Sequence, residues 1–288
     1  MGLRINNNIA AFNAYRNLSV TDGQMSKSLE KLSSGYRINR AADDAAGLAI
    51  SESLRSQIGG LKVAVRNAQD GVSVVQTAEG ALNETTSILQ RMRDLAVQAS
   101  NGGSQDTVAQ ADANTEFVQL ANELDRIANT TKFGNQSLLG GSYQGAFQVG
   151  SESTTVSAAN AITVDITSAG ALGGLTITGL DSAGLAVSGA SLTSTANATS
   201  AIDTLDTALK DVSTVRATLG AYQNRFEHTI NNLNVAVENL SASESRIRDT
   251  DMAQEMVQFT RAQILSQAGT AMLAQANQAP QSVLKLLQ

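Results

Sequence analysis

Two long stretches of this chain carry apolar residues at heptad spacing, and they constrain its fold more than any other feature. In the first stretch, a second series at Ile58, Val65 and Val72 accompanies the main one. The main series consists of Leu54, Leu61, Ala68, Val75, Leu82, Leu89 and Ala96. An apolar period of 3.5 residues forms the seam of an α-helical coiled coil. The stretch therefore predicts one long helix that pairs with another.

The second stretch repeats this spacing from Ile202 to Leu240. A single helix from Leu54 to Ala96 would be about 64 Å long, whereas a compact globule of this chain length has a radius of gyration of only about 19 Å. Helices of this length do not fit inside such a globule. We therefore expect a mainly α protein, built as an elongated antiparallel coiled-coil rod.

A shorter amphipathic helix is predicted between the two long ones, from Val108 to Ile127, antiparallel to the first across the turn at 101–103. In residues 141–200 charged residues become rare and Gly, Ser, Thr and Ala dominate. Short alternations, Ile162/Val164/Ile166 and Leu175/Ile177, favour weak strands there. We expect a small β-hairpin region at one end of the rod.

Both ends of the chain are amphipathic. The N-terminal stripe predicts a helix that stops at Ser33-Ser34-Gly35, since glycine suits the position after a helix end. The C-terminal helix should begin after an N-cap within residues 249–251, and Pro280 should kink or end it. The N-terminal stripe consists of Ile5, Ile9, Phe12, Tyr15, Leu18, Met25, Leu29 and Leu32. The C-terminal stripe consists of Met252, Met256, Phe259, Leu265, Ala268, Met272 and Ala276, with an apolar tail at Val283, Leu284, Leu286 and Leu287.

Neither terminal stripe has a core of its own, so we expect these segments to be poorly ordered alone and to fold on association. The predicted assembly residues are Ile5, Ile9, Phe12, Leu29, Leu32, Met256, Phe259, Leu265, Met272, Leu284 and Leu287. We expect the chain to be organised in five segments: the N-terminal helix in 1–43, the first rod helices in 44–140, the β-rich segment in 141–200, the last rod helix in 201–248 and the C-terminal helix in 249–288.

Composition excludes most chemistry. The chain has no Cys and one His, His228, which lies off the heptad seam as a solvated surface residue would. We expect no metal, no cofactor and no catalytic site. Asp43 and Asp44 precede a predicted helix and are interpreted as caps rather than an acid–base pair. With 20 Lys+Arg against 26 Asp+Glu, nucleic acid is an unexpected partner. No apolar run approaches the roughly 18 residues that a membrane helix needs, and no standard secretory signal is present.

The chain resembles the bacterial flagellins over residues 3–139 and 201–288. The resemblance rests on stretches such as LSSGYRINRAADDAAGLAIS, QRMRDLAVQAS, LGAYQNRFEHTINNL and SRIRDTDMAQE, which occur in that family's order. It implies a filament subunit whose terminal segments pair as an inner tube, D0, and whose long helices form the surrounding rod, D1. It further implies flagellar type III export to the cell exterior, a C-terminal export chaperone, and filament cap and hook-junction partners.

The same resemblance implies contacts with the vertebrate Toll-like receptor for flagellin. Arg91, Leu95 and Glu116 match the family's contact positions, whereas Asp94 replaces the more usual Glu with a shorter carboxylate.

Three other classes of protein fit this sequence less well. A hook–filament junction protein resembles flagellin at its ends, but the continuous match through QRMRDLAVQ favours the filament subunit. A secreted coiled-coil translocator or adhesin is disfavoured because no long apolar hairpin is present. An enzyme is disfavoured because no nucleophile–base pair or metal set is present.

Overall fold

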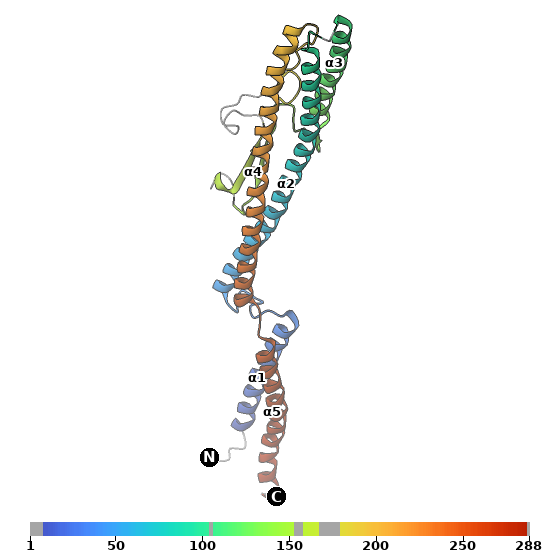
Figure 1. Cartoon of the computed structure of the whole chain (residues 1–288). Coiled ribbons are helices and arrows are strands. Elements are labelled where there is room, and N and C mark those ends of the chain that lie inside the picture. Colours follow the sequence, from blue (N-terminus) through green and yellow to red (C-terminus); the bar gives the residue numbers. More distant parts are fainter. Residues whose placement is uncertain (1–7, 104–105, 153–157, 167–178, 287–288) are drawn as a thin grey trace. The chain divides into compact units, whose positions relative to one another are not determined.

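The structure is a computed structural model that describes residues 8–103, 106–152, 158–166 and 179–286, without the side chains of 279–286. The chain divides into two units: residues 1–57 with 238–288 form unit 1, and residues 58–237 form unit 2. Each unit is described separately. Figure 1 shows the course of the chain.

Unit 2 is built on three helices, α2 (Ala45–Ala99), α3 (Thr107–Thr130) and α4 (Thr195–Arg248), of which α2 begins and α4 ends in unit 1. Both α3 and α4 run antiparallel to α2 (Figure 1). Ion pairs join α2 to both partners. Arg93 of α2 binds Asp206 of α4, and Arg91 binds Glu116 of α3. Large apolar residues of the three predicted helices fill the space between them. These include the fully buried Leu82, Leu89, Met92, Phe117, Leu124, Leu205, Val212 and Phe226.

Two small antiparallel sheets complete unit 2. The first joins β1 (Lys132–Phe133) to β2 (Gln136–Ser137), and the second joins β3 (Gln144–Gln148) to β4 (Ala161–Asp165). In the second sheet Phe147 pairs with Ile162, and the Phe147 ring meets Phe226 of α4 edge to face, with centroids 5.5 Å apart. The hairpin is therefore packed onto the helices by an aromatic pair.

A segment without regular structure, residues 179–192, closes the core beside α3. Its apolar side chains Leu180, Leu185, Val187 and Leu192 are almost fully buried. Asp125 of α3 accepts hydrogen bonds from the backbone N–H and the hydroxyl of Ser182, at 2.8 and 3.0 Å. About three turns earlier on the same helix, the side-chain oxygen of Asn114 accepts a hydrogen bond from the N–H of Leu192. Polar groups of α3 thus hold this irregular segment, whose own backbone lacks a sheet or helix partner.

Unit 1 contains α1 (Ile9–Ser34) and α5 (Met252–Leu286), which lie side by side (Figure 1). Gly35 follows α1 with a left-handed φ of 75°, and its N–H donates to Lys31 O, as predicted. Asp251 Oδ1 accepts the N–H groups of Ala253 and Gln254 and so caps α5. Both predicted helix signals are confirmed.

Of the two outcomes predicted for Pro280, a kink or an end of the helix, the structure excludes the end, because α5 continues past Pro280 to Leu286. Proline lacks the N–H that would donate to the carbonyl four residues earlier, which belongs to Ala276. The Asn8 side-chain amide donates to that carbonyl instead, at 2.7 Å. A side chain near the start of α1 therefore satisfies the acceptor that Pro280 leaves open.

The mainly α class with a small β-hairpin region is confirmed. The Ile162/Val164 alternation forms β4, whereas Leu175 and Ile177 lie outside the described residues. The predicted segment borders remain predictions. The borders between the two units lie at 57/58 and 237/238, inside the long helices, and not at the helix ends near 44 and 248.

Candidate assembly surface

The helices α1 and α5 meet along a heptad seam made mostly of small or polar residues. From Ala11 to Ser28 the shielded positions of α1 recur at alternating steps of three and four, and so do those of α5 from Glu255 to Ala276. Only Leu18, Met25, Phe259 and Leu273 are large and apolar among them. The α1 seam is Ala11, Ala14, Leu18, Thr21, Met25 and Ser28. The α5 seam is Glu255, Phe259, Ala262, Ser266, Gly269, Leu273 and Ala276.

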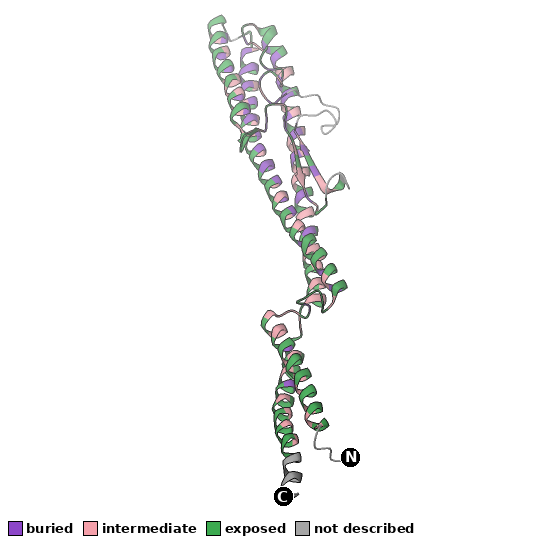
Figure 2. Cartoon of the chain, turned by 180° about the vertical axis from the view of Figure 1, so that it is seen from behind, coloured by how far each residue is buried: buried purple, intermediate pink, exposed green. Residues whose placement is uncertain are grey.

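Most large apolar residues of these helices lie off the seam, exposed to solvent. Phe12 is 70% exposed, Met272 65% and Ile264 61%. Figure 2 shows the contrast: purple, buried residues are frequent along the helices of unit 2, whereas the described parts of α1 and α5 are mainly green and pink. The exposed set is Ile9, Phe12, Tyr15, Val20, Leu29, Met252, Met256, Val257, Ile264, Leu265 and Met272. Where exposed apolar residues of this kind lie together, they mark an interaction site.

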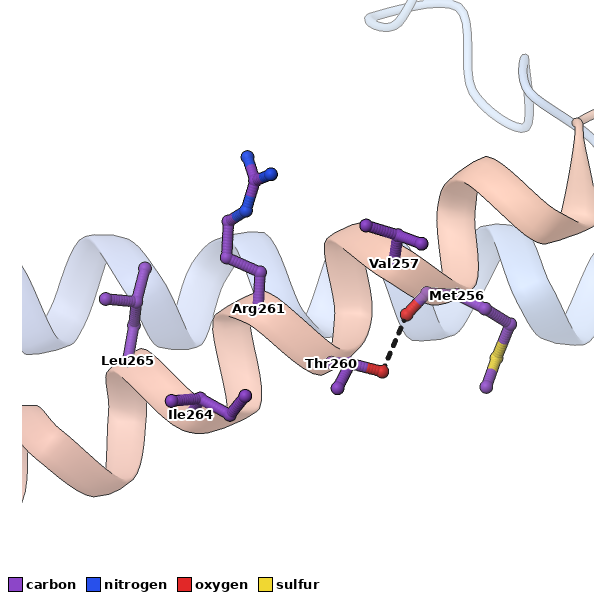
Figure 3. A pocket seen from close by; sticks show the side chains of 6 residues that line it. All are labelled: Met256, Val257, Thr260, Arg261, Ile264 and Leu265. Atoms are coloured by element: carbon purple, nitrogen blue, oxygen red, sulfur yellow. Dashed lines mark hydrogen bonds between the residues drawn. The ribbon is translucent and has the colours of Figure 1, made fainter.

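Two shallow grooves lie within this surface. The first runs along α5 alone and is lined by Met256, Val257, Thr260, Arg261, Ile264 and Leu265. Figure 3 shows these side chains pointing away from the helix, with the Thr260 hydroxyl donating to Met256 O at 2.8 Å. That hydrogen bond satisfies the hydroxyl, and Arg261 is the one charged residue among the six that line the groove. The second groove joins both helices and is lined by Asn8, Ala11, Phe12, Tyr15, Leu273 and Asn277.

The structure separates the predicted assembly residues into two groups. Ile9, Phe12, Leu29, Met256, Leu265 and Met272 are exposed, whereas Phe259, in the seam, and Leu32, beyond its end, are half-buried. Ile5, Leu287 and the side chain of Leu284 lie outside the described residues. The prediction of one stripe per helix missed this division, because Leu18 and Met25 face α5 while Phe12 and Tyr15 do not. Val257 and Ile264 were not predicted, because they lie outside the apolar stripe that the sequence shows for the C-terminal helix.

The three residues matched to the receptor site do not share one environment. Arg91 and Glu116 are exposed and form an ion pair, 2.8 Å from Arg91 Nη2 to Glu116 Oε1. Leu95 is only 3% exposed and packs in the core of unit 2. Its side chain presents almost no surface to a partner.

The other singled-out residues have ordinary structural roles. His228 is exposed on α4. Asp44 Oδ1 accepts the N–H of Gly47 and caps α2, while Asp43 accepts the N–H groups of Asn39 and Arg40 in the preceding loop. Those N–H groups lower the pKa of the Asp43 carboxyl. Within the described residues, no cluster of three potential metal ligands occurs, and none of the helices there is long and apolar enough to span a membrane.

Comparison with known proteins places this architecture in a family. The bacterial flagellin N-terminal helical region matches residues 5–144, and the C-terminal helical region matches residues 202–287. Flagellin of Halalkalibacterium halodurans is 53% identical over 98% of this chain and 99% of that protein. Flagellin of Bacillus subtilis is 49% identical over 99% of this chain and 100% of that protein. The crystal structure of Bacillus cereus flagellin is 30% identical, has a TM-score of 0.48, and covers 58% of this chain and 88% of that one.

The long paired helices, the exposed apolar terminal pair and these matches together define a structural, filament-forming protein rather than an enzyme. The chain belongs to the bacterial flagellin family, and it is a subunit of the flagellar filament.

Proposed function

We propose that α1 and α5 complete their folding during polymerisation, because the large apolar side chains outside their seam become buried between subunits. The observation that carries this proposal is the division between a seam of small residues and a surface of large apolar ones. A pair of helices held by Ala, Ser, Thr and Gly buries little apolar area inside one molecule. The remaining apolar area is available only to another subunit.

The magnitudes support a process that needs several neighbours. Each of the eleven exposed side chains retains about half of its burial free energy, or about 1 kcal/mol. Together they supply on the order of 10 kcal/mol. Association costs about 4–15 kcal/mol in lost translational and rotational freedom. A single contact between two subunits is therefore marginal, and growth requires a nucleus.

Val257 offers a sharp test, because Val235 is a nearly perfect control. Val257 lies in the α5 groove and is 58% exposed, whereas Val235 lies on α4 and is 57% exposed. Val257→Ser should raise the critical concentration for filament growth roughly fivefold, which corresponds to about 1 kcal/mol of lost burial. Val235→Ser should leave it unchanged. Equal effects of the two substitutions would contradict the proposal.

Truncation tests the same idea more coarsely. Deleting residues 1–35 or 250–288 should leave a helical monomer that forms no filaments, as judged by circular dichroism and electron microscopy after seeding. Hydrogen exchange should show α1 and α5 weakly protected in dilute monomer and strongly protected in filaments. Filaments that grow from either truncated protein would refute coupled folding and assembly.

We further propose that the chain leaves the cell through the flagellar type III apparatus and functions extracellularly, with an export chaperone on its C-terminal segment. The family assignment and the exposed α5 groove support this proposal. Val257→Ser combined with Ile264→Ser should weaken binding of the purified chaperone in calorimetry, whereas Val235→Ser should not. The cap and hook-junction proteins are proposed as partners of the filament ends. In cells without the export apparatus, the chain should stay inside and be absent from the medium.

For the vertebrate Toll-like receptor we propose contacts through Arg91 and Glu116, with Leu95 supporting them from the core. A second exposed pair, Arg126 with Glu123 on α3, provides the control. Arg91→Ala with Glu116→Ala should reduce signalling in receptor-expressing reporter cells, and Arg126→Ala with Glu123→Ala should not. Equal responses from the two double variants would contradict this site.

A further inference from the structure

The seam between α1 and α5 specifies its own register poorly. Leu18 of α1 faces Gly269, where a Cβ would lie 3.3 Å from Leu18 Cδ1. One heptad away on either side, the seam of α5 carries Ala262 and Ala276. A slip of seven residues would again place Leu18 against a small residue. In a coiled coil, register is usually fixed by distinctive side chains in the seam, and few are present here.

Among the described residues, the Asn8 amide donates to Ala276 O at the end of the pair where α1 begins, whereas the two polar contacts nearer the end of α1 add little. Ser266 donates to Asp22 Oδ1 at 2.9 Å, and Lys31 Nζ lies 3.8 Å from Glu255 Oε2. The first contact is exposed and the second is long. An exposed hydrogen bond contributes little to stability because water competes for its partners, and an ion pair as long as 3.8 Å is weak because its charges are far apart.

A stronger determinant lies where the two helices meet their connecting segments. Here residues 35–37 and 248–250 form a short antiparallel ladder, named the clasp below. Thr250 N donates to Gly35 O at 3.0 Å, Arg37 N donates to Arg248 O at 2.7 Å, and Tyr36 pairs with Asp249. Since α1 ends at Ser34 and α5 begins at Met252, the clasp adjoins both helices with almost no slack.

The side chain of Arg248 anchors the clasp. Its guanidinium lies 4.7 Å from the centre of the Tyr36 ring, and its Nη1 donates to Glu52 Oε1 at 2.7 Å. The side chain of Arg248 is 13% exposed and that of Glu52 is 54% exposed, and the position of the guanidinium over the Tyr36 ring adds a cation–π attraction to this ion pair. On the other strand, Arg37 Nη2 donates to Ile247 O at 2.6 Å. Each strand of the clasp is therefore held by a side chain of the other.

We propose that the clasp, anchored by Arg248 on Tyr36 and Glu52, determines the register in which α1 pairs with α5. A one-heptad slip moves one helix about 10.5 Å along the other. The connecting residues between clasp and helices are too few to span that distance, so a slip requires the clasp to open. Arg248 is thus a positioning residue for the assembly surface, since register decides which exposed side chains of α1 and α5 lie together.

Cysteine cross-linking tests the proposal directly, because the natural chain contains no Cys. A Cβ at residue 269 would lie 3.8 Å from Leu18 Cβ, which suits a disulfide. Leu18→Cys is combined with Gly269→Cys for the native register, and with Ala262→Cys or Ala276→Cys for the slipped registers. Each full-length protein is oxidised as dilute monomer and as filaments. The intrachain disulfide is then quantified by non-reducing electrophoresis and mass spectrometry.

With the clasp intact, the native disulfide should exceed either slipped one by at least about tenfold. In the protein that carries both Arg248→Ala and Tyr36→Ala, the native disulfide should exceed either slipped one by no more than about threefold. The reason is that molecules that leave the native register form the slipped disulfides instead. Arg248→Lys, which keeps a charge beside Glu52, should recover part of the excess. The matched control is Arg246→Ala, since Arg246 bonds only locally to Ser243. It should leave the ratio unchanged.

Three results would overturn the proposal. The tenfold excess could persist in the Arg248→Ala, Tyr36→Ala protein, so that something else sets the register. All three disulfides could fall equally in that protein, so that the clasp stabilises the pair without selecting a register. Finally, the intact protein could form none of the disulfides, or all of them equally, so that no defined register exists.

Discussion

Gly71 of α2 is a position where one added methyl group should clearly harm the fold. A Cβ at this residue would lie 2.6 Å from Cζ of Phe226 and 2.9 Å from its Cε1. The Phe226 ring is fully buried in α4, and the Phe147 ring packs against it at an interplanar angle of 87°. The ring therefore has no free space into which it could retreat. The clash falls on the rigid part of the core rather than on a flexible side-chain end.

Two opposing effects set the size of the change caused by Gly71→Ala. Alanine is favoured over glycine inside a helix by about 1 kcal/mol. Overpacking a core costs about 1–3 kcal/mol, and a contact about 1 Å too short against a fixed ring belongs at the upper end. The net loss of unfolding free energy is about 2 kcal/mol. For a unit of this size, that loss lowers Tm by about 4–8 °C.

Gly80→Ala is the matched control, because Gly80 also lies inside α2 and a Cβ there would have no neighbour within 4 Å. It should raise the unfolding free energy by about 0.5–1 kcal/mol through helix propensity alone. Thermal unfolding of dilute monomers, followed by circular dichroism at 222 nm, compares the two variants. Phe226→Leu added to Gly71→Ala should recover part of the loss. If Gly71→Ala stabilises the chain as Gly80→Ala does, the packing argument is refuted.

Three further predictions concern unit 2. Asp125→Ala should lower the unfolding free energy by about 1–3 kcal/mol, measured as a lower urea midpoint, because it leaves the buried Ser182 N–H without an acceptor; an unchanged midpoint would contradict this. Leu95→Ala should cost about 2–5 kcal/mol in the same assay, so a signalling loss in that variant would report packing, and a stable variant would contradict the burial of Leu95. The hydrogen bond from Arg93 lowers the pKa of Asp206, so the carboxylate favours the folded state above its unfolded pKa of about 3.9 and loses that effect as pH falls through the lower, folded pKa. The Tm difference between Asp206→Asn and the natural chain should therefore shrink below about pH 4; a difference that stays constant down to acid pH would refute the role of ionisation.

The sequence predicted those parts of the fold that repeat over many residues. Heptads at Leu82, Leu89 and Leu205 indicated long paired helices, because a helix seam repeats its side-chain type every turn or two. Local caps such as Gly35 and Asp251 were equally readable, since they depend on one or two neighbouring residues. The strand β3 was missed because QGAFQ has one large apolar residue, Phe147, whose role depends on Phe226 nearly eighty residues later.

The sequence predicted many of the apolar residues of the assembly surface, but not which of the stripe residues face the partner helix and which face solvent. The sequence analysis placed Leu18 and Phe12 in one stripe, whereas in the structure Leu18 faces α5 and Phe12 faces solvent. A heptad pattern gives the faces of a helix but not which face its partner covers, and that choice depends on small residues such as Gly269. The contact between Asn8 and the carbonyl left open by Pro280 joins opposite ends of the chain, so no local pattern could indicate it.

In each unit a helix glycine makes room for a large side chain of another helix, but the amount of apolar surface buried there differs. In unit 2, Gly71 makes room for Phe226, a rigid ring held on several sides, so the space is filled by the molecule itself. In unit 1, Gly269 makes room for Leu18, whose flexible end approaches the Cβ position at 3.3 Å, while Phe12, Ile264 and Met272 remain outside the pair. Close approach of two backbones with few large side chains between them buries little apolar area. The terminal helices can therefore pair without becoming a finished core, and this leaves most of their apolar surface to be buried by neighbouring subunits.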